Sequence, residues 1–92
     1  MNVFTKGTFE RDVEGVSDVV LLEALHEKIQ QIEIASAIGQ ITGLKLLRGY
    51  KTHYRIKLIA NDASFRIGAI IRGNTIWLVR FLPRKKIYQQ FP

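Results

Sequence analysis

The spacing of apolar residues changes near Leu44, and this change constrains the fold more than any other feature of the sequence. Before it, apolar residues recur every three or four positions, as expected for a helix buried on one side: Leu22, Leu25, Ile29 and Ile32. After it, apolar and polar residues alternate over 54–58, which is typical of a half-buried strand. Helices followed by strands predict an α+β domain, with an N-terminal helical hairpin packed on one face of a curved antiparallel sheet.

Potential capping residues divide the first half into two helices. We expect a short helix over residues 8–14, with Thr8 as its N-cap and Gly15 just after its end. Ser17-Asp18 begins a longer helix, which Gly39 closes. Three acidic residues lie off its apolar stripe, which favours a solvated helix face over a catalytic carboxylate group: Glu23, Glu27 and Glu33.

A two-residue turn joins the last two predicted strands. Gly73-Asn74 favours a tight hairpin between strands over residues 65–72 and 75–82. Pro83 ends the second of these strands. Residues 84–90 are then expected to form a short C-terminal helix.

The register of this hairpin separates an apolar face from a basic one. Counting back from the turn pairs Arg66 with Phe81, on the face opposite the core. Apart from Arg80, the core face carries apolar residues: Phe65, Ile67, Ala69, Ile71, Ile76 and Leu78. Because Arg55 and Lys57 alternate with core residues of the preceding strand, we expect them beside Arg66, over a floor that Gly68 keeps low. An ordinary solvated exterior is the alternative interpretation of these cations.

The length and composition exclude several classes of protein. A chain of 92 residues suffices for one small domain, so we expect a single domain over residues 1–92. There is no apolar run of about 18 residues and no signal-peptide pattern at the N-terminus, which predicts a cytoplasmic protein that binds no membrane. The absence of cysteine excludes disulfides, thiol nucleophiles and thiolate-ligated zinc.

The net charge of +6 is divided unevenly along the chain. Residues 1–43 contain three basic and seven acidic residues, a balance of −4, whereas residues 44–92 contain eleven basic residues and only Asp62, a balance of +10. Such a concentrated positive field points to a polyanionic partner, either nucleic acid or an acidic protein. Arg80, which has the parity of the core, is assigned no role.

The residue types in the basic half narrow the chemistry. A two-metal nuclease needs several carboxylates where this half has only Asp62, so we expect no metal and no other cofactor. His26 lies in the long helix, which excludes a two-histidine ribonuclease site, and His53 is more simply a strand residue than a general base. What remains is phosphoryl chemistry in which cations stabilise a phosphorane-like charge and Tyr88 exchanges a proton.

Five short motifs follow one another in the second half: Leu47-Arg48-Gly49-Tyr50, Tyr54-Arg55-Ile56-Lys57, Phe65-Arg66-Ile67-Gly68, Pro83-Arg84-Lys85-Lys86-Ile87-Tyr88 and Phe91-Pro92. In order and spacing they closely resemble the RelE/ParE superfamily of bacterial toxins, in its RelE-like branch. The resemblance implies a small α+β toxin of a type II toxin–antitoxin system. It further implies an enzyme that enters the ribosomal A site and cuts mRNA without a metal, through attack of a 2′-hydroxyl on the adjacent phosphate.

The same resemblance implies roles for individual residues. Arg55 and Lys57 would neutralise the phosphate, with Lys57 among the catalytic residues. Arg66 would stabilise the pentacovalent phosphate, Arg84 would hold the backbone or leaving group, and Tyr88 would stack on a base or transfer a proton. The RNA-binding cations, in addition to Arg55, are expected to be Arg48, Lys51, Lys85 and Lys86.

The sequence departs from the family pattern in two places. Arg55 stands where relatives often carry lysine, and since an arginine keeps its proton at neutral pH, the identity of the general base stays open. The connection from Leu58 to Phe65, with a turn at Asn61-Asp62, is longer than the family's usual hairpin. Convergence of Lys57 and Arg66 then requires the extra residues to bulge out of the sheet.

Two other functions share the implied fold: a ParE-like inhibitor of DNA gyrase, and an inactive relative that only binds its antitoxin. The presence together of Arg55, Lys57, Arg66, Arg84 and Tyr88 favours the enzyme. Its expected partners are a cognate acidic antitoxin, the ribosome and mRNA, with DNA reached only indirectly through the antitoxin complex. The alternative is a basic half that stays free and binds only ribosomal RNA.

Overall fold

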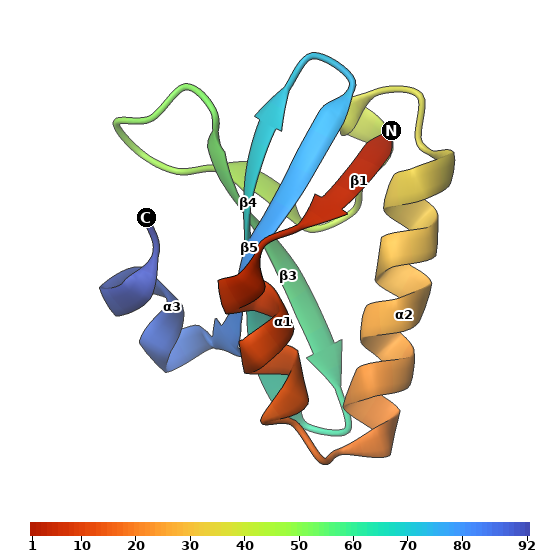
Figure 1. The fold of residues 1–92 in the computed structure, drawn as a ribbon, viewed down its shortest axis with the longest axis vertical. Coiled ribbons are helices and arrows are strands. Elements are labelled where there is room, and N and C mark those ends of the chain that lie inside the picture. The colour runs from red at the N-terminus through yellow and green to blue at the C-terminus, as the bar shows by residue number, and fades with distance from the viewer.

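The computed structural model describes all residues, 1–92, and shows a five-stranded sheet covered by helices on both faces (Figure 1). The elements follow in the order β1 (Asn2–Thr5), α1 (Gly7–Glu14), α2 (Val19–Ile34), η1 (Ile38–Gln40), β2 (Leu44–Leu46), β3 (His53–Ala60), β4 (Ala63–Arg72), β5 (Thr75–Pro83) and α3 (Arg84–Gln90). The α+β class and the C-terminal helix are thereby confirmed. No helix is long and apolar enough to cross a membrane.

The sheet has the strand order β1-β5-β4-β3-β2 and is mixed, because β1 runs parallel to β5 while the other neighbours are antiparallel. The prediction of a wholly antiparallel sheet is therefore wrong at this edge. β1 has only four residues, too few for a period to be recognised, and its partners Thr75–Leu78 lie near the other end of the chain.

The core lies between one face of the sheet and the first two helices, as the alternation predicts. Ile67, Ala69, Ile76 and Leu78 are fully buried there, and Phe65 packs against them. From α2 the core receives Leu21, Leu25 and Ile32, which share one helical face. Burial of these side chains is the main source of stability in a chain of this size.

The boundaries of the two N-terminal helices differ in part from the prediction. Asp18 caps α2 as expected, since its Oδ1 accepts from the Leu21 N–H at 3.1 Å. Thr8 is not an N-cap: α1 begins at Gly7, and the Thr8 hydroxyl donates to the carbonyl oxygen of Val79 in β5. α2 ends at Ile34 rather than near Gly39. The N-terminal ammonium of Met1 donates to the freed carbonyls of Ile32, Glu33 and Ala35 at this end.

The two N-terminal helices pack on different strands, α1 chiefly on β5 and α2 chiefly on β3. Both helices cover the same face of the sheet, and each packs more extensively on the sheet than on the other helix. A further link comes from Lys28 in α2, whose Nζ donates to the carbonyl and hydroxyl oxygens of Thr42 at 3.1 and 2.7 Å. Partial burial lowers the pKa of Lys28 below its ordinary value.

Both hairpins close with two-residue turns. The turn at Gly73-Asn74 is confirmed, with Arg72 paired to Thr75. The expected turn at Asn61-Asp62 is also present, and both of its residues have positive φ, 50° and 65°. The expectation that extra residues bulge outward is wrong, because β3 and β4 stay paired as far as Ala60 and Ala63. The additional residues lengthen the two strands.

A β-bulge in β5 changes the register that counting from the turn predicts. Pairing skips Val79, so that Ala69 faces Leu78 while the preceding residue of β4, Gly68, faces Arg80. Arg66 consequently pairs with Leu82 and not with Phe81. Because of the bulge, Arg80 pairs with Gly68 and no longer has the parity of the core residues that the sequence pattern had indicated.

Candidate nucleic-acid interface

The face of the sheet opposite α1 and α2, here called the basic face, carries cations on three neighbouring strands. Lys45 of β2 lies opposite Arg55 of β3, and Lys57 of β3 lies directly opposite Arg66 of β4. None of these four forms an ion pair; the single salt bridge of the structure joins Arg80 to Asp12 at 2.8 Å. The positive charge of this face is therefore uncompensated and favours a polyanion.

Arg66 lies on the expected face but is not open to solvent as the sequence predicts. Its exposed fraction is 5%, and its Nη1 donates to the Ser64 hydroxyl at 3.1 Å and to the Phe65 carbonyl at 3.0 Å. The Nε atom is buried and has no partner. Because an unpaired buried donor is costly, the Nε–H of this guanidinium retains the capacity to donate to a further acceptor, such as an anionic oxygen.

Arg55 and Lys57 differ in how they are held. Arg55 Nη1 donates to the carbonyl oxygen of Gly43 at 2.6 Å, which directs the guanidinium toward β2. Lys57 is exposed, and only its backbone N–H meets the same carbonyl, at 3.0 Å. Lys57 and Arg66 are thus neighbours across the ladder, whereas Arg55 leans toward the neighbouring strand.

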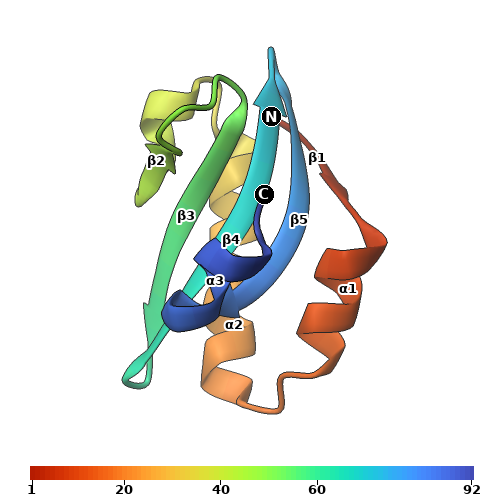
Figure 2. The same cartoon turned by 90° about the vertical axis from the view of Figure 1, so that its left-hand side faces the viewer.

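Helix α3 crosses the basic face, as Figure 2 shows in front of β4 and β5. Ile87 and Phe91 point into the sheet and are buried. The Phe91 ring rests on Gly68, where a Cβ atom would lie only 2.6–2.9 Å from three ring carbons. Gly68 does keep the floor low, as predicted, but the space is filled by Phe91 and not by a ligand.

The rings of His53 and Tyr50 continue from Phe91 along the same face. The His53 ring lies 5.7 Å from that of Phe91 and 5.0 Å from that of Tyr50, and its Nδ1 lies 3.1 Å from the Thr52 hydroxyl oxygen. This packing favours the interpretation of His53 as a strand residue that supports its aromatic neighbours.

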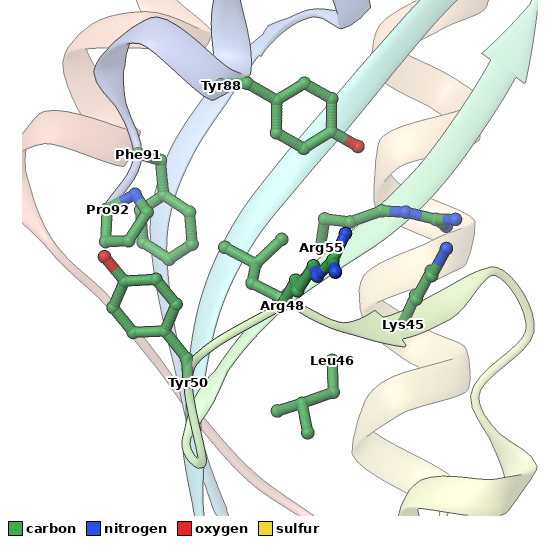
Figure 3. Close-up of a pocket in the computed structure, with 9 residues that line it drawn as sticks. Lys45, Leu46, Arg48, Tyr50, Arg55, Tyr88, Phe91 and Pro92 are labelled. Atoms are coloured by element: carbon green, nitrogen blue, oxygen red, sulfur yellow. The ribbon is translucent and has the colours of Figure 1, made fainter.

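The chain end and the segment after β2 enclose a pocket of about 560 Å³, which we call the C-terminal pocket (Figure 3). Tyr50, Phe91 and Pro92 lie on one side of it, and the cationic ends of Lys45, Arg48 and Arg55 lie on the other, with Leu46 beside these cations. Its lining consists of Lys45, Leu46, Leu47, Arg48, Tyr50, Arg55, Tyr88, Phe91 and Pro92.

The structure brings together only part of the predicted site. Arg48, Arg55 and Tyr88 share the C-terminal pocket, while Lys57 and Arg66 pair beyond it on the basic face. The other predicted residues are exposed on α3 or in the connection after β2, outside the pocket lining: Arg84, Lys85, Lys86 and Lys51. No group of three or more His, Asp or Glu side chains comes together.

Three charged or aromatic lining residues were absent from the predicted site: Lys45, Tyr50 and Phe91. A signal existed for each of them. Tyr50 and Phe91 belong to motifs that the sequence analysis singled out, and Lys45 lies between two leucines in the alternating segment. Their meeting in one pocket depends on the path of α3, which local patterns do not contain.

Comparison with known proteins gives a consistent result. The chain is 29% identical to Toxin RelE3 of Methanocaldococcus jannaschii, over the full length of both proteins. Among solved structures it is similar to the RelB-RelE antitoxin-toxin complex from Methanococcus jannaschii, with a TM-score of 0.74, 26% identity, and coverage of 97% of this chain and 99% of the other. A metal-bound toxin from Helicobacter pylori, at a TM-score of 0.52, 20% identity and coverage of 95% and 98%, shares the fold. No protein-family model matches the chain.

The five-stranded sheet, its uncompensated basic face and these full-length likenesses define the class as a small α+β domain similar to RelE toxins. Within this class the chain is similar along its whole length to a toxin named RelE3 and to a chain of a RelB-RelE antitoxin-toxin complex.

Proposed function

We propose that this chain is a RelE-family toxin of a toxin–antitoxin system, and that it is a ribosome-dependent, metal-independent mRNA endonuclease that acts in the cytoplasm and inhibits translation. The basic face carries the proposal, because Lys57 and Arg66 lie opposite each other with no carboxylate to neutralise them. A phosphodiester in a transition state of increased negative charge is the ligand that such a pair would stabilise most.

The chemistry would begin with attack of a 2′-hydroxyl oxygen on the adjacent phosphorus, as the hydroxyl proton passes to water. Lys57 and Arg66 would stabilise the pentacovalent phosphate, with the unpaired Nε–H of Arg66 as an available donor. The bond to the 5′-oxygen of the next nucleotide then breaks, and a cyclic phosphate remains. Arg84, exposed at the start of α3, would hold the leaving side of the backbone.

Tyr88 has two candidate roles, because its side chain is 56% exposed and reaches the C-terminal pocket. Its hydroxyl would supply a proton, or its ring would stack on a base. The substitution Tyr88→Phe separates the two: a large loss of single-turnover rate assigns proton transfer, and a near-normal rate assigns stacking.

An acidic antitoxin is the proposed protein partner, supported by the similarity to the toxin of an antitoxin-toxin complex and by the balance of +10 in residues 44–92. DNA would be reached only through that complex. Co-expression with the neighbouring gene product, followed by size-exclusion chromatography at low and high salt, should yield a complex that high salt weakens.

The decisive experiment incubates the purified chain with programmed ribosomes that carry end-labelled mRNA, in parallel with naked mRNA. We expect cleavage at the A site only when ribosomes are present. Loss of DNA supercoiling by gyrase without mRNA cleavage would instead identify a ParE-like inhibitor. Binding of the antitoxin with neither effect would identify an inactive relative.

A further inference from the structure

The C-terminal pocket has an aromatic surface as well as a cationic one. A phosphate alone would contact only the cationic surface. Tyr50, Phe91 and Pro92 line one side, and the cationic ends of Arg48 and Arg55 lie across from them (Figure 3). Its volume of about 560 Å³ lies within the range usual for small-molecule sites, roughly 300–1,000 Å³. A ligand with one flat apolar part and one anionic part fits this division.

The apolar wall is fixed before any ligand arrives. Phe91 is 4% exposed and rests on Gly68, and its backbone N–H donates to the Ile87 carbonyl at 2.8 Å. His53 lies between Phe91 and Tyr50 and supports both rings. A flat ligand would therefore lose little of its binding free energy to ordering of the protein.

The ring of Tyr50 nevertheless remains accessible. It is 44% exposed, although its backbone N–H is held by the Leu47 carbonyl at 3.1 Å. The pocket thus combines an exposed aromatic ring, that of Tyr50, with the guanidinium groups of Arg48 and Arg55, which form no salt bridge. Proteins bind single-stranded nucleic acid with such a combination, since every base offers a flat surface for stacking. An acidic peptide would use the cations of this pocket but leave the aromatic wall without a partner.

We infer that the C-terminal pocket binds one nucleotide of single-stranded RNA, with its base stacked on Tyr50 and its phosphate held by Arg48 and Arg55. It is a base-accepting subsite beside the phosphate that Lys57 and Arg66 face, so the inference rests on the proposed function. Binding at this subsite contributes to the affinity for RNA whether or not the RNA is cleaved.

The test measures binding of a fluorescein-labelled, 2′-O-methylated oligoribonucleotide to the full-length chain by anisotropy; methylation prevents cleavage. Tyr50→Ala should weaken binding about 10-fold or more, and Tyr50→Phe should bind within about twofold of wild type because the ring remains. Phe4→Ala is the matched control, since Phe4 is 54% exposed but stacks on Trp77 outside the pocket lining. It should bind as wild type does.

An oligonucleotide that lacks one base makes the test specific for stacking. Scanning the abasic position should reveal one position where wild type loses affinity and where Tyr50→Ala causes no further loss. Equal effects of Tyr50→Ala on intact and abasic oligonucleotides at every position would overturn the inference. So would weaker binding of the antitoxin with unchanged binding of RNA, which would identify a peptide site.

The two proposals fail in different ways. If the chain binds RNA in this base-dependent manner but does not cleave mRNA on ribosomes, the subsite stands and the enzymatic proposal falls. If the chain cleaves mRNA while Tyr50→Ala leaves RNA affinity unchanged, the subsite falls and the enzymatic proposal stands. Circular dichroism confirms that each variant is folded.

Discussion

Gly68 is the position where a single missing methyl group shapes the candidate site. The Phe91 ring occupies the place that a side chain would take, and through it the C-terminal pocket acquires its floor. The role of this glycine is thus close approach to a ring and not an unusual backbone conformation, since its φ lies outside the left-handed range.

Gly68→Ala should destabilise the protein by about 1–3 kcal/mol, because the new methyl group forces Phe91 off the sheet. Chemical denaturation measures the change. Gly7→Ala is the control: nothing lies within 4 Å of its added Cβ, and alanine is favourable in a helix. Equal stability of the two variants would contradict the proposed packing of Phe91 on Gly68.

Arg66→Ala should lower the single-turnover rate of mRNA cleavage by roughly 10²-fold or more, because the guanidinium meets charge that develops in the transition state. Ribosome affinity should change much less, since many other cations contribute to it. Because Arg66 is buried, the measurement is made with saturating toxin on variants shown to be folded. Arg72→Ala, exposed at the hairpin tip, is the control. A wild-type rate for Arg66→Ala would rule out its catalytic role.

At the scale of elements, the bulge in β5 is held by α1. β1 pairs with β5 only as far as Leu78, so the following edge of β5 has no neighbouring strand. Asp12 of α1 accepts there from the Phe81 N–H at 3.0 Å and from Arg80 Nε at 2.8 Å. Side chains of one helix thus satisfy backbone groups that an edge strand would leave open.

Asp12→Ala should cost more stability than Arg80→Ala, by about 1–2 kcal/mol. The first substitution leaves the Phe81 N–H without its acceptor, whereas the second removes only the ion pair. Midpoints of urea unfolding measure both. Glu14→Ala, exposed at the end of α1, should be close to neutral. A greater destabilisation by Arg80→Ala would mean that the ion pair, and not the hydrogen bond to the backbone, stabilises the bulge.

Lys28 connects α2 to the segment before β2, and burial lowers its pKa. The unfolded chain therefore binds the proton more tightly than the folded one. The contribution of Lys28 to the free energy of unfolding should rise with pH between its lowered pKa and the ordinary value of 10.5. Denaturation of wild type and Lys28→Met over alkaline pH measures this: the difference between them should move in favour of wild type as pH rises. A constant difference would contradict the shift.

For the whole molecule, the division of charge between the two halves of the sequence becomes a division between surfaces. The acidic residues of α2 lie on its exposed side, while the cations of residues 44–92 gather on the basic face and on α3. A polyanion approaching the protein is therefore attracted to the side that carries the candidate site.

RNA affinity should fall steeply with salt, and the slope should report which cations take part. Replacing the exposed pair Lys85 and Lys86 with alanine should reduce the slope of log K against log salt by about 0.7 for each phosphate that is no longer neutralised. Replacing Lys6 and Arg11, exposed cations of the acidic half, should leave the slope unchanged. Anisotropy with 2′-O-methylated RNA over a KCl series makes the comparison. Equal slopes for both double variants would contradict a localised interface.

Features set by neighbouring residues were predictable from the sequence. The change of period at Leu44, the cap at Asp18 and the turn at Gly73-Asn74 determine α2 and the two hairpin strands, and with them which face is apolar. These patterns depend on interactions between residues close in the sequence, so they can be recognised without knowledge of the tertiary fold. Basic residues on the opposite face follow from the same alternation.

Features that join distant parts of the chain were decided only by the tertiary structure. The parallel pairing of β1, the end of α2 at Ile34 and the skipped residue Val79 all depend on partners far away in sequence. The burial of Arg66 and the C-terminal pocket depend on α3 folding back over β4. Alternation along a strand determines the face to which a side chain points, but whether that face meets water or another element depends on the path of the rest of the chain.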